Sequence, residues 1–273
     1  PTEGSLEKGF VIPRDSALRS ILGKGDQTPC EYRTGQAVTL WPLELTEAHY
    51  FAGREPVAHL ELPELARVRA GIRLRLRTTL PDLPISKLAL DRLAIFLRGS
   101  DTLPGRLYEQ LLANVVLLIA RPSERPAPWH EVIAGHSLRR LGFADEQALL
   151  PCPPPSFHGY RLLQEYFAFP QRFLFVELGG LEPAVRRCTG RELEVLILLD
   201  RADPTLENMV SAAQFALFCA PAINLFPKRA DRIHLTEQVA EHHLVLDRTR
   251  PMDFEVVQVA HVTGIGAENE EQE

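Results

Sequence analysis

Apolar and cationic side chains alternate strictly through residues 72–77, whose sequence is Ile-Arg-Leu-Arg-Leu-Arg. Successive side chains of a β-strand point to opposite faces, so this pattern predicts three aliphatic side chains on one face and three guanidinium groups on the other. Such a segment is typical of a half-buried strand. It indicates a sheet that covers a core on one side and presents arginines on the other.

Further runs of β-branched and other apolar residues, bounded by Gly, Pro or Asp, are typical of strands. They cover residues 9–13, 30–33, 36–41, 87–90, 93–97, 114–120, 173–178, 192–200 and 254–262. Helical spacing occurs near residues 104–114, where Pro104 suits the first turn, and at residues 158–167. This balance predicts an α+β, strand-rich fold with β-sandwich-like sheets and a few short crossover helices.

The stretch at residues 151–156, Pro-Cys-Pro-Pro-Pro-Ser, contains too much proline for a helix or a central strand. We interpret it as an internal boundary. The sequence then divides into a strand-rich domain at 1–150, a second α+β domain at 151–265, and an acidic disordered tail at 266–273.

The charge balance disfavours some classes of partner. Among 273 residues, 30 are Lys or Arg and 36 are Asp or Glu, and the net charge of -6 does not suit binding to nucleic acid. The uncharged stretch at residues 215–227 is shorter than the ~20 apolar residues of a membrane-spanning helix, so we expect no membrane insertion. The cysteines, which form no C-x-x-C pair, are expected to be free thiols. They are Cys30, Cys152, Cys188 and Cys219.

No motif supports a metal or cofactor site. The histidines closest in sequence are His234, His242 and His243, and an adjacent pair does not place both rings on one face of a helix or strand. The glycines at 23–25 and 264–266 lack the spacing of phosphate-binding and dinucleotide-binding loops. We therefore expect no metal ion and no cofactor.

Catalytic candidates have structural interpretations. Ser156 lies close to His158 but suits the N-cap of the helix at 158–167. Asp200 and Asp203 follow a predicted strand and are typical of a turn. We expect no catalytic residues, and a hydrolase is the least favoured alternative.

Aromatic residues are concentrated between residues 157 and 175. Leu163, Tyr166 and Phe167 lie at helical i, i+3, i+4 spacing, so the sequence predicts that they are part of the core. A buried subunit interface is the second interpretation. Aromatics exposed in a groove would favour an alternative function, a β-sandwich module that binds a peptide or carbohydrate. The set is Phe157, Tyr160, Tyr166, Phe167, Phe169, Phe173 and Phe175.

Three ordered blocks, at residues 142–170, 219–230 and 246–256, closely resemble the TssF (ImpG/VasA) family of bacterial type VI secretion systems. The second resembles the family pattern C-x-P-x-x-N-L-F and the third D-R-x-R-P-x-D-F-E-V. The residues that match the family motifs are Phe157, Gly159, Tyr160, Leu163, Gln164, Tyr166, Phe167, Pro170, Pro221, Asn224, Leu225, Phe226, Asp247, Arg248 and Pro251. Arg248 and Arg250 alternate beside Asp247, where pairing within the chain is favoured over pairing across an interface.

The resemblance implies a non-enzymatic scaffold, and the chain looks like a central fragment of a longer family member. By resemblance, two copies of TssF join one TssG to form a baseplate wedge that carries TssE and connects to TssK. Six wedges surround the VgrG spike beneath the contractile tail. The implied location is cytoplasmic, at the baseplate docked on the inner-membrane complex.

Overall fold

The computed structural model describes residues 6–24, 28–100, 102–151, 157–235, 240–265 and 271–272. The chain forms two compact units. Unit 1 comprises Pro1–Ala17 and Arg33–Ile223, and unit 2 comprises Leu18–Tyr32 and Asn224–Glu273.

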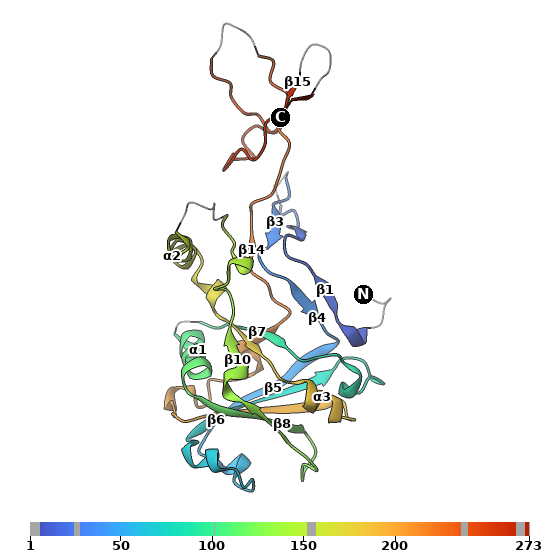
Figure 1. The fold of residues 1–273 in the computed structure, drawn as a ribbon, viewed down its shortest axis with the longest axis vertical. Helices are drawn as coiled ribbons and strands as arrows, with labels where there is room; N and C mark the ends of the chain where they lie inside the picture. Colours follow the sequence, from blue (N-terminus) through green and yellow to red (C-terminus); the bar gives the residue numbers. More distant parts are fainter. Residues whose placement is uncertain are drawn as a thin grey trace. The chain divides into compact units, whose positions relative to one another are not determined.

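An antiparallel five-stranded sheet forms the larger layer of unit 1 (Figure 1), with strand order β5-β6-β12-β8-β9. The strands are β5 (Leu43–Ala52), β6 (Ala70–Thr78), β12 (Glu192–Leu199), β8 (Val115–Pro122) and β9 (Glu131–Ala134). β12 is central and carries apolar side chains at six of its eight positions. It therefore matches a strand that is buried on both faces.

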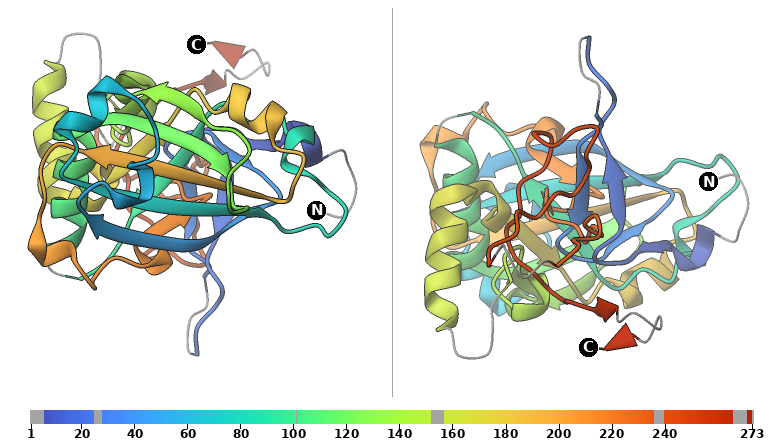
Figure 2. Two further views of the ribbon diagram at one scale, coloured as in Figure 1. Left: turned by 90° about the horizontal axis from the view of Figure 1, so that it is seen from below. Right: turned by 90° about the horizontal axis from the view of Figure 1, so that it is seen from above.

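A second antiparallel sheet has the order β10-β11-β7-β13. Its strands are β10 (Leu138–Arg140), β11 (Phe175–Leu178), β7 (Leu93–Leu97) and β13 (Phe215–Leu217). Inward side chains of both sheets, such as Ile95 of β7 and Ile197 of β12, belong to one buried cluster. In the left view of Figure 2 the five-stranded sheet is seen face-on, with its strands side by side. The two sheets, which share one buried cluster, confirm the expected strand-rich, sandwich-like α+β class.

The alternation at residues 72–77 determines which face of β6 is buried. Ile72, Leu74 and Leu76 are at most 1% exposed and lie in the core shared by the two sheets. Arg73 and Arg75 lie on the opposite face, within ion-pair distance of Glu47. The prediction of a half-buried strand at this position is confirmed.

The α-helices of the described residues are α1 (Leu103–Ala113), α2 (His158–Ala168) and α3 (Glu182–Arg187). Both helices expected from the sequence, near 104–114 and 158–167, are present, and Pro104 lies in the first turn of α1. The smaller sheets are formed by β1 (Phe10–Ile12) with β4 (Val38–Leu40), by β14 (Ala222–Ile223), β3 (Glu31–Thr34) and β2 (Ala17–Arg19), and by β15 (Gly264–Ile265) with β16 (Glu271–Gln272).

Some expectations differ from the structure. Residues 254–262 were expected to form a strand, and that prediction is wrong: they pair with no strand within the part of the chain that the structure describes. Residues 87–90 form the end of a 3-10 turn and a loop instead of a strand. Both segments have strand propensity without a neighbouring strand, and backbone groups form a ladder only when a partner strand is present.

The expected boundary at 150–151 does not coincide with the two compact units. Strands from both sides of this position pair within the same sheets, as β12 does with β6 and β8. Residues 152–156 lie outside the described residues, as does most of the tail expected at 266–273, of which 271–272 form β16.

The described cysteines Cys30, Cys188 and Cys219 are free, and Cys152 lies outside the described residues. Within the described ranges, no helix has the length and apolar character to cross a membrane.

Candidate interaction surface

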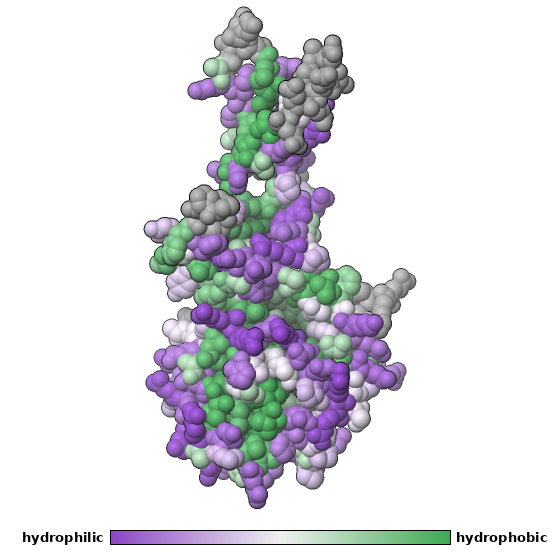
Figure 3. Space-filling model, in the orientation of Figure 1, coloured by the Kyte–Doolittle hydropathy of each residue, from purple (hydrophilic) through white to green (hydrophobic). Residues whose placement is uncertain are grey.

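Helix α2 is oriented with its charged residues inward and its aromatic residues outward. Arg161 is 5% exposed and Glu165 is 2% exposed. The large apolar side chains of α2 and its flanks are instead exposed, and in Figure 3 apolar side chains are seen at the surface over this helix. They are Phe157 (68%), Tyr160 (72%), Leu163 (57%), Tyr166 (52%), Phe167 (80%) and Phe169 (40%). We call these six residues the α2 aromatic face.

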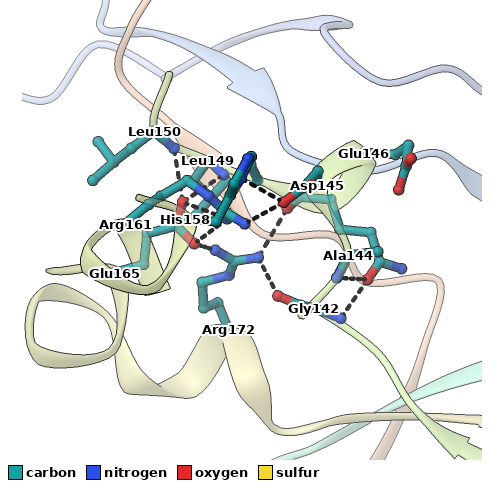
Figure 4. A network of polar contacts seen from close by, with 12 residues as sticks. Gly142, Ala144, Asp145, Glu146, Leu149, Leu150, His158, Arg161, Glu165 and Arg172 are labelled. Atoms are coloured by element: carbon teal, nitrogen blue, oxygen red, sulfur yellow. Dashed lines mark hydrogen bonds and ion pairs between the residues drawn. The ribbon is translucent and has the colours of Figure 1, made fainter. Parts of the chain in front are cut away.

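Glu165 is the centre of the buried network beneath α2 (Figure 4). Its Oε1 accepts hydrogen bonds from the backbone N–H groups of Leu149, at 3.0 Å, and Leu150, at 2.9 Å. Its carboxylate also pairs with Arg161 at 3.3 Å and with Arg172. A buried carboxylate is tolerated when charged and backbone donors satisfy it, and these groups provide both kinds.

Arg172 connects the network to the preceding loop. Its Nη2 donates to the carbonyl oxygens of Gly142, at 2.6 Å, and Gln147, at 2.9 Å. Burial lowers the pKa of Arg172 to about 10, with smaller contributions from Arg161 and Arg14, so the guanidinium remains charged at neutral pH. Gly142 has a φ of 94°, and a Cβ at this position would lie 2.9 Å from the Arg172 carbonyl oxygen, so the loop requires glycine.

Asp145 connects the loop to the first turn of α2. Its Oδ1 lies 2.9 Å from Arg161 Nη2 and 3.1 Å from His158 Nδ1. A carboxylate near a helix N-terminus also interacts favourably with the helix dipole. The loop at residues 142–150 therefore holds α2 through its charged side, which leaves the α2 aromatic face on the opposite side.

The rings of the α2 aromatic face contact one another in edge-to-face pairs. The ring centroids of Phe157 and Tyr160 are 5.4 Å apart, and those of Tyr166 and Phe167 are 5.5 Å apart. A Cβ on Gly159 would lie 2.3 Å from Phe157 Cε1, so the glycine allows this ring to rest against the helix. These contacts give the surface a defined shape.

The expectation that Leu163, Tyr166 and Phe167 belong to the core is wrong, because all three are exposed. Within the aromatic cluster, the buried side chains are Phe173 and Phe175. The helical spacing correctly indicated one apolar face. It gave the wrong direction because the opposite, charged face has its partners in the loop at residues 142–150, which precedes the helix.

The other motif residues lie in different surroundings. Pro221 is buried in unit 1, and its carbonyl accepts a hydrogen bond from Gly35 N at 2.8 Å. In unit 2, Phe226 packs edge-to-face on Phe254 at 6.4 Å, and Lys228 Nζ lies 3.8 Å from the centre of the Phe254 ring. These contacts lie within their own units.

Internal contacts also account for the third block. Asp247 accepts hydrogen bonds from the backbone N–H of Thr249, at 3.0 Å, and from its hydroxyl, at 2.6 Å. These bonds lower the pKa of Asp247. Arg248 pairs with Asp231 at 3.2 Å, and Arg250 donates to the Thr28 hydroxyl at 2.6 Å.

The motif residues therefore lie in separate regions of the chain. Phe157, Gly159, Tyr160, Leu163, Gln164, Tyr166, Phe167 and Pro170 lie in α2 or next to it, whereas Asn224, Leu225, Phe226, Asp247, Arg248 and Pro251 lie in unit 2. Asn224 and Pro251 are exposed, and Leu225 is half-buried. The residues of the first group lie together on or beside one helix. Among the motif residues that the structure describes, this group has the large exposed apolar side chains.

The aspartates considered for catalysis have structural roles. Asp203 accepts hydrogen bonds from the N–H and hydroxyl of Thr205 and pairs with Arg106 at 3.2 Å, which confirms its interpretation as a turn residue. Asp200 pairs with Arg67 at 3.3 Å. Ser156 lies outside the described residues.

An open depression of about 540 Å³ lies beside β5 and β13, and its lining includes Leu43, Glu44, Arg98 and Phe215 but no residue of α2. The exposed aromatics thus lie on a helix surface and not in this depression. Among the described residues, no group of three or more His, Cys, Asp or Glu side chains is arranged to hold a metal ion.

Sequence reasoning missed the residues that orient α2, namely Arg161, Glu165, Arg172 and Asp145. A signal was present, because Arg161 and Glu165 lie one turn apart on the face opposite the apolar residues. Such a pair is normally solvated, and the sequence does not indicate that the preceding loop folds back over it.

Comparisons with known proteins agree on one family. The family model described as "Type VI secretion system, TssF" matches residues 1–273. The chain is 51% identical over 267 residues to the type VI secretion system component TssF1 of Pseudomonas aeruginosa. The matched region covers 98% of this chain and 43% of that relative.

A solved structure is also similar. A chain from a cryo-electron microscopy structure of the type VI secretion system TssK-TssF-TssG baseplate subcomplex matches with a TM-score of 0.76 and 25% identity, over 97% of this chain and 47% of that chain. The fold is that of a strand-rich α+β protein, and the exposed aromatic face of α2 is suited to contact with another protein. The chain belongs to the TssF family of type VI secretion proteins. It spans less than half the length of these two relatives.

Proposed function

We propose that this chain is part of a structural, non-enzymatic baseplate subunit of a type VI secretion system. In this role it forms a wedge with TssG, TssE and a second TssF copy, around the VgrG spike. The wedge connects to TssK and to the contractile tail, on the cytoplasmic side of the inner-membrane complex. Family membership and the likeness to a chain of the TssK-TssF-TssG subcomplex support this assignment.

The observation that carries the proposal is that likeness, which extends over 97% of the chain. The arrangement of the charged groups agrees with a scaffold. Asp145, Asp200 and Asp203, which could have served as acids or bases, are engaged with neighbouring cations. Scaffolds are held together by contact area, and the α2 aromatic face offers such an area.

The test is co-expression of the protein with TssG and TssK, followed by affinity purification on TssG and measurement of mass by light scattering. We expect a stable complex with two copies of the protein per TssG. As a control, the same purification is done with TssG alone and with the protein alone. Recovery of the protein as a species that binds neither TssG nor TssK would contradict the proposal.

A further inference from the structure

Within the part of the chain that the structure describes, unit 2 has no buried core. None of its residues whose burial is described is buried, and the buried hydrophobic residues all lie in unit 1. Large apolar side chains of unit 2 are instead exposed (Figure 3), among them Ile21 (95%), Leu235 (82%) and Met252 (93%). A unit of this size normally needs a buried apolar core, disulfides or a metal ion to be stable.

The contacts within unit 2 do not replace a core. Arg248 pairs with Asp231 on the surface, and Phe226 packs edge-to-face on Phe254 at a centroid distance of 6.4 Å. Exposed ion pairs contribute little to stability. Cys30, the cysteine of unit 2, is free, and the described residues include no group arranged to hold a metal ion. A stable unit 2 therefore requires apolar residues from another polypeptide segment.

Residues 254–262 have the composition of a buried strand, although they are mostly exposed. Six of the nine residues are apolar, and Glu255 is the one residue among them that belongs to the Asp, Glu, Lys and Arg group. Val256, Val257, Val259 and Val262 are between 41% and 72% exposed. Disordered segments contain few β-branched residues, and edge strands often carry charges or proline. The apolar residues occupy both faces of the predicted strand, which is typical of a strand covered on both faces.

We infer that residues 254–262 form a strand of a domain that unit 2 shares with the part of the TssF polypeptide outside residues 1–273, and that this part supplies the neighbouring strands and the apolar layer. The matched region is 43% of TssF1 and 47% of the similar chain in the baseplate subcomplex, so more than half of each relative lies outside it. A domain normally has its core within one chain, and a covalently attached segment has a high effective concentration. The inference rests on family membership and not on the proposed function.

Other occupants fit less well. If a partner subunit supplied the neighbouring strand, a valine-rich segment would stay exposed until assembly, and such segments tend to aggregate. A second copy of this chain would pair its own residues 254–262 with one edge of the segment. That pairing satisfies backbone groups but leaves the apolar side chains on both faces in solvent.

Hydrogen–deuterium exchange followed by mass spectrometry tests this inference. Residues 1–273 are compared with the chain extended to the length of its TssF relatives, both without other baseplate proteins. We expect the backbone amides of 255–262 to exchange at least about a hundredfold more slowly in the longer chain, because amides paired in a strand are protected. The central strand β12 is the control, since it should be protected in both chains.

Three outcomes of the exchange experiment would overturn the inference. The first is equally rapid exchange of 255–262 in both chains. The second is protection that appears only after TssG or TssK is added, which would assign the neighbouring strand to a partner subunit. The third is protection that increases with protein concentration, which would assign it to a second copy.

A matched pair of variants gives an independent measurement. Val257→Asp in unit 2 is compared with Val132→Asp on the edge strand β9, since these valines are 68% and 48% exposed. In the longer chain we expect Val257→Asp to lower the melting temperature by at least about 4 °C, because burying an unpaired carboxylate is costly. In residues 1–273 it should change the melting temperature by less than about 2 °C. Val132→Asp should have the same small effect in both chains. An effect of Val257→Asp that is the same in both chains would contradict the inference.

Discussion

Arg161 and Glu165 lie one turn apart in α2 and form an ion pair of 3.3 Å in which both side chains are buried. Pairs at this spacing are normally on a solvated helix face. In α2 this pair helps to attach the helix to the rest of unit 1. The aromatic residues on the other side of the helix are exposed. The polar half of this helix thus stabilises the fold.

Replacing Glu165 with Gln is expected to destabilise the protein strongly. The change removes the negative charge that faces Arg161 and Arg172 in a buried site. Breaking a buried ion pair by removing one partner costs about 3–5 kcal/mol, because the remaining charge is uncompensated. Urea denaturation followed by circular dichroism measures the loss.

Glu182→Gln is the matched control. Glu182 also pairs with an arginine one turn away, Arg186, but the two side chains are 51% and 74% exposed. Exposed pairs contribute at most about 1 kcal/mol. If both substitutions cost the same, the buried network does not hold α2 in the way described.

A second buried glutamate has a similar role in the five-stranded sheet. Glu194 of β12 is fully buried and lies between Arg75 of β6 and Arg121 of β8 in the strand register. Its carboxylate is 2.7 Å from both Arg121 and Arg125. Glu194→Gln is expected to cost about 3–5 kcal/mol in the free energy of unfolding.

Glu44→Gln on β5 serves as the comparison for this cluster. Glu44 pairs with Arg77 at 2.7 Å on the same sheet, with both side chains nearly half exposed. Its replacement is expected to change stability by less than about 1 kcal/mol. Calorimetry of the two variants separates the cases, and a smaller effect for Glu194→Gln than for Glu44→Gln would refute the argument.

The sequence predicts most of the sheet structure because hydrophobic periodicity is local. The alternation at 72–77 identified β6 and its buried face, and the apolar run at 192–200 identified β12. The same reasoning did not anticipate Glu194 as a buried charge within this apolar strand. Its arginine partners come from β6, β8 and the loop after β8, so they are close only in the folded chain.

The sequence predicts which residues form the candidate surface, but it does not show whether that surface is buried or exposed. The aromatic cluster and the helix at 158–167 were predicted, and Leu163, Tyr166 and Phe167 were correctly placed on one face. Whether that face is buried depends on Leu149 and Leu150, whose backbone N–H groups bind Glu165 on the opposite side of the helix. Backbone carbonyl and N–H groups have no sequence signature, so this information comes only from the structure.

We expect the contribution of Asp203, in the turn after β12, to the free energy of unfolding to depend on pH. The hydroxyl and N–H of Thr205, together with Arg106, hold the pKa of Asp203 below its usual value of 3.8. A carboxylate with a lowered folded pKa stabilises the protein above its unfolded pKa, and this contribution is lost as the pH falls through the folded pKa. Asp203→Asn should therefore lower stability by at most about 1 kcal/mol at pH 7, because it removes the charge that pairs with the half-exposed Arg106 while the amide oxygen can still accept the Thr205 bonds.

The pH dependence provides the check on this prediction. The stability difference between Asp203→Asn and wild type should decrease as the pH falls below the unfolded pKa of an aspartate, about 3.9, because the unfolded chain then binds a proton before the folded chain does. Denaturation curves at pH 7 and pH 3 measure the two differences. A difference that is the same at both values would show that the carboxylate charge is not involved.

Two phenylalanines near α2 test the orientation of the helix directly. Phe167 is 80% exposed, whereas Phe173 is 6% exposed and contacts the rings of Phe143, at 4.9 Å, and Tyr166, at 6.0 Å. Phe167→Ala is expected to change the free energy of unfolding by at most about 0.5 kcal/mol, because an exposed side chain loses little packing. Phe173→Ala is expected to cost about 3–5 kcal/mol, since it leaves a cavity. Because the two substitutions are chemically identical and the effect of helix propensity is only a few tenths of a kcal/mol, their difference in urea denaturation mainly reports burial. A loss of more than 2 kcal/mol for Phe167→Ala would mean that the aromatic face of α2 packs inside the folded chain and is not a surface for a partner.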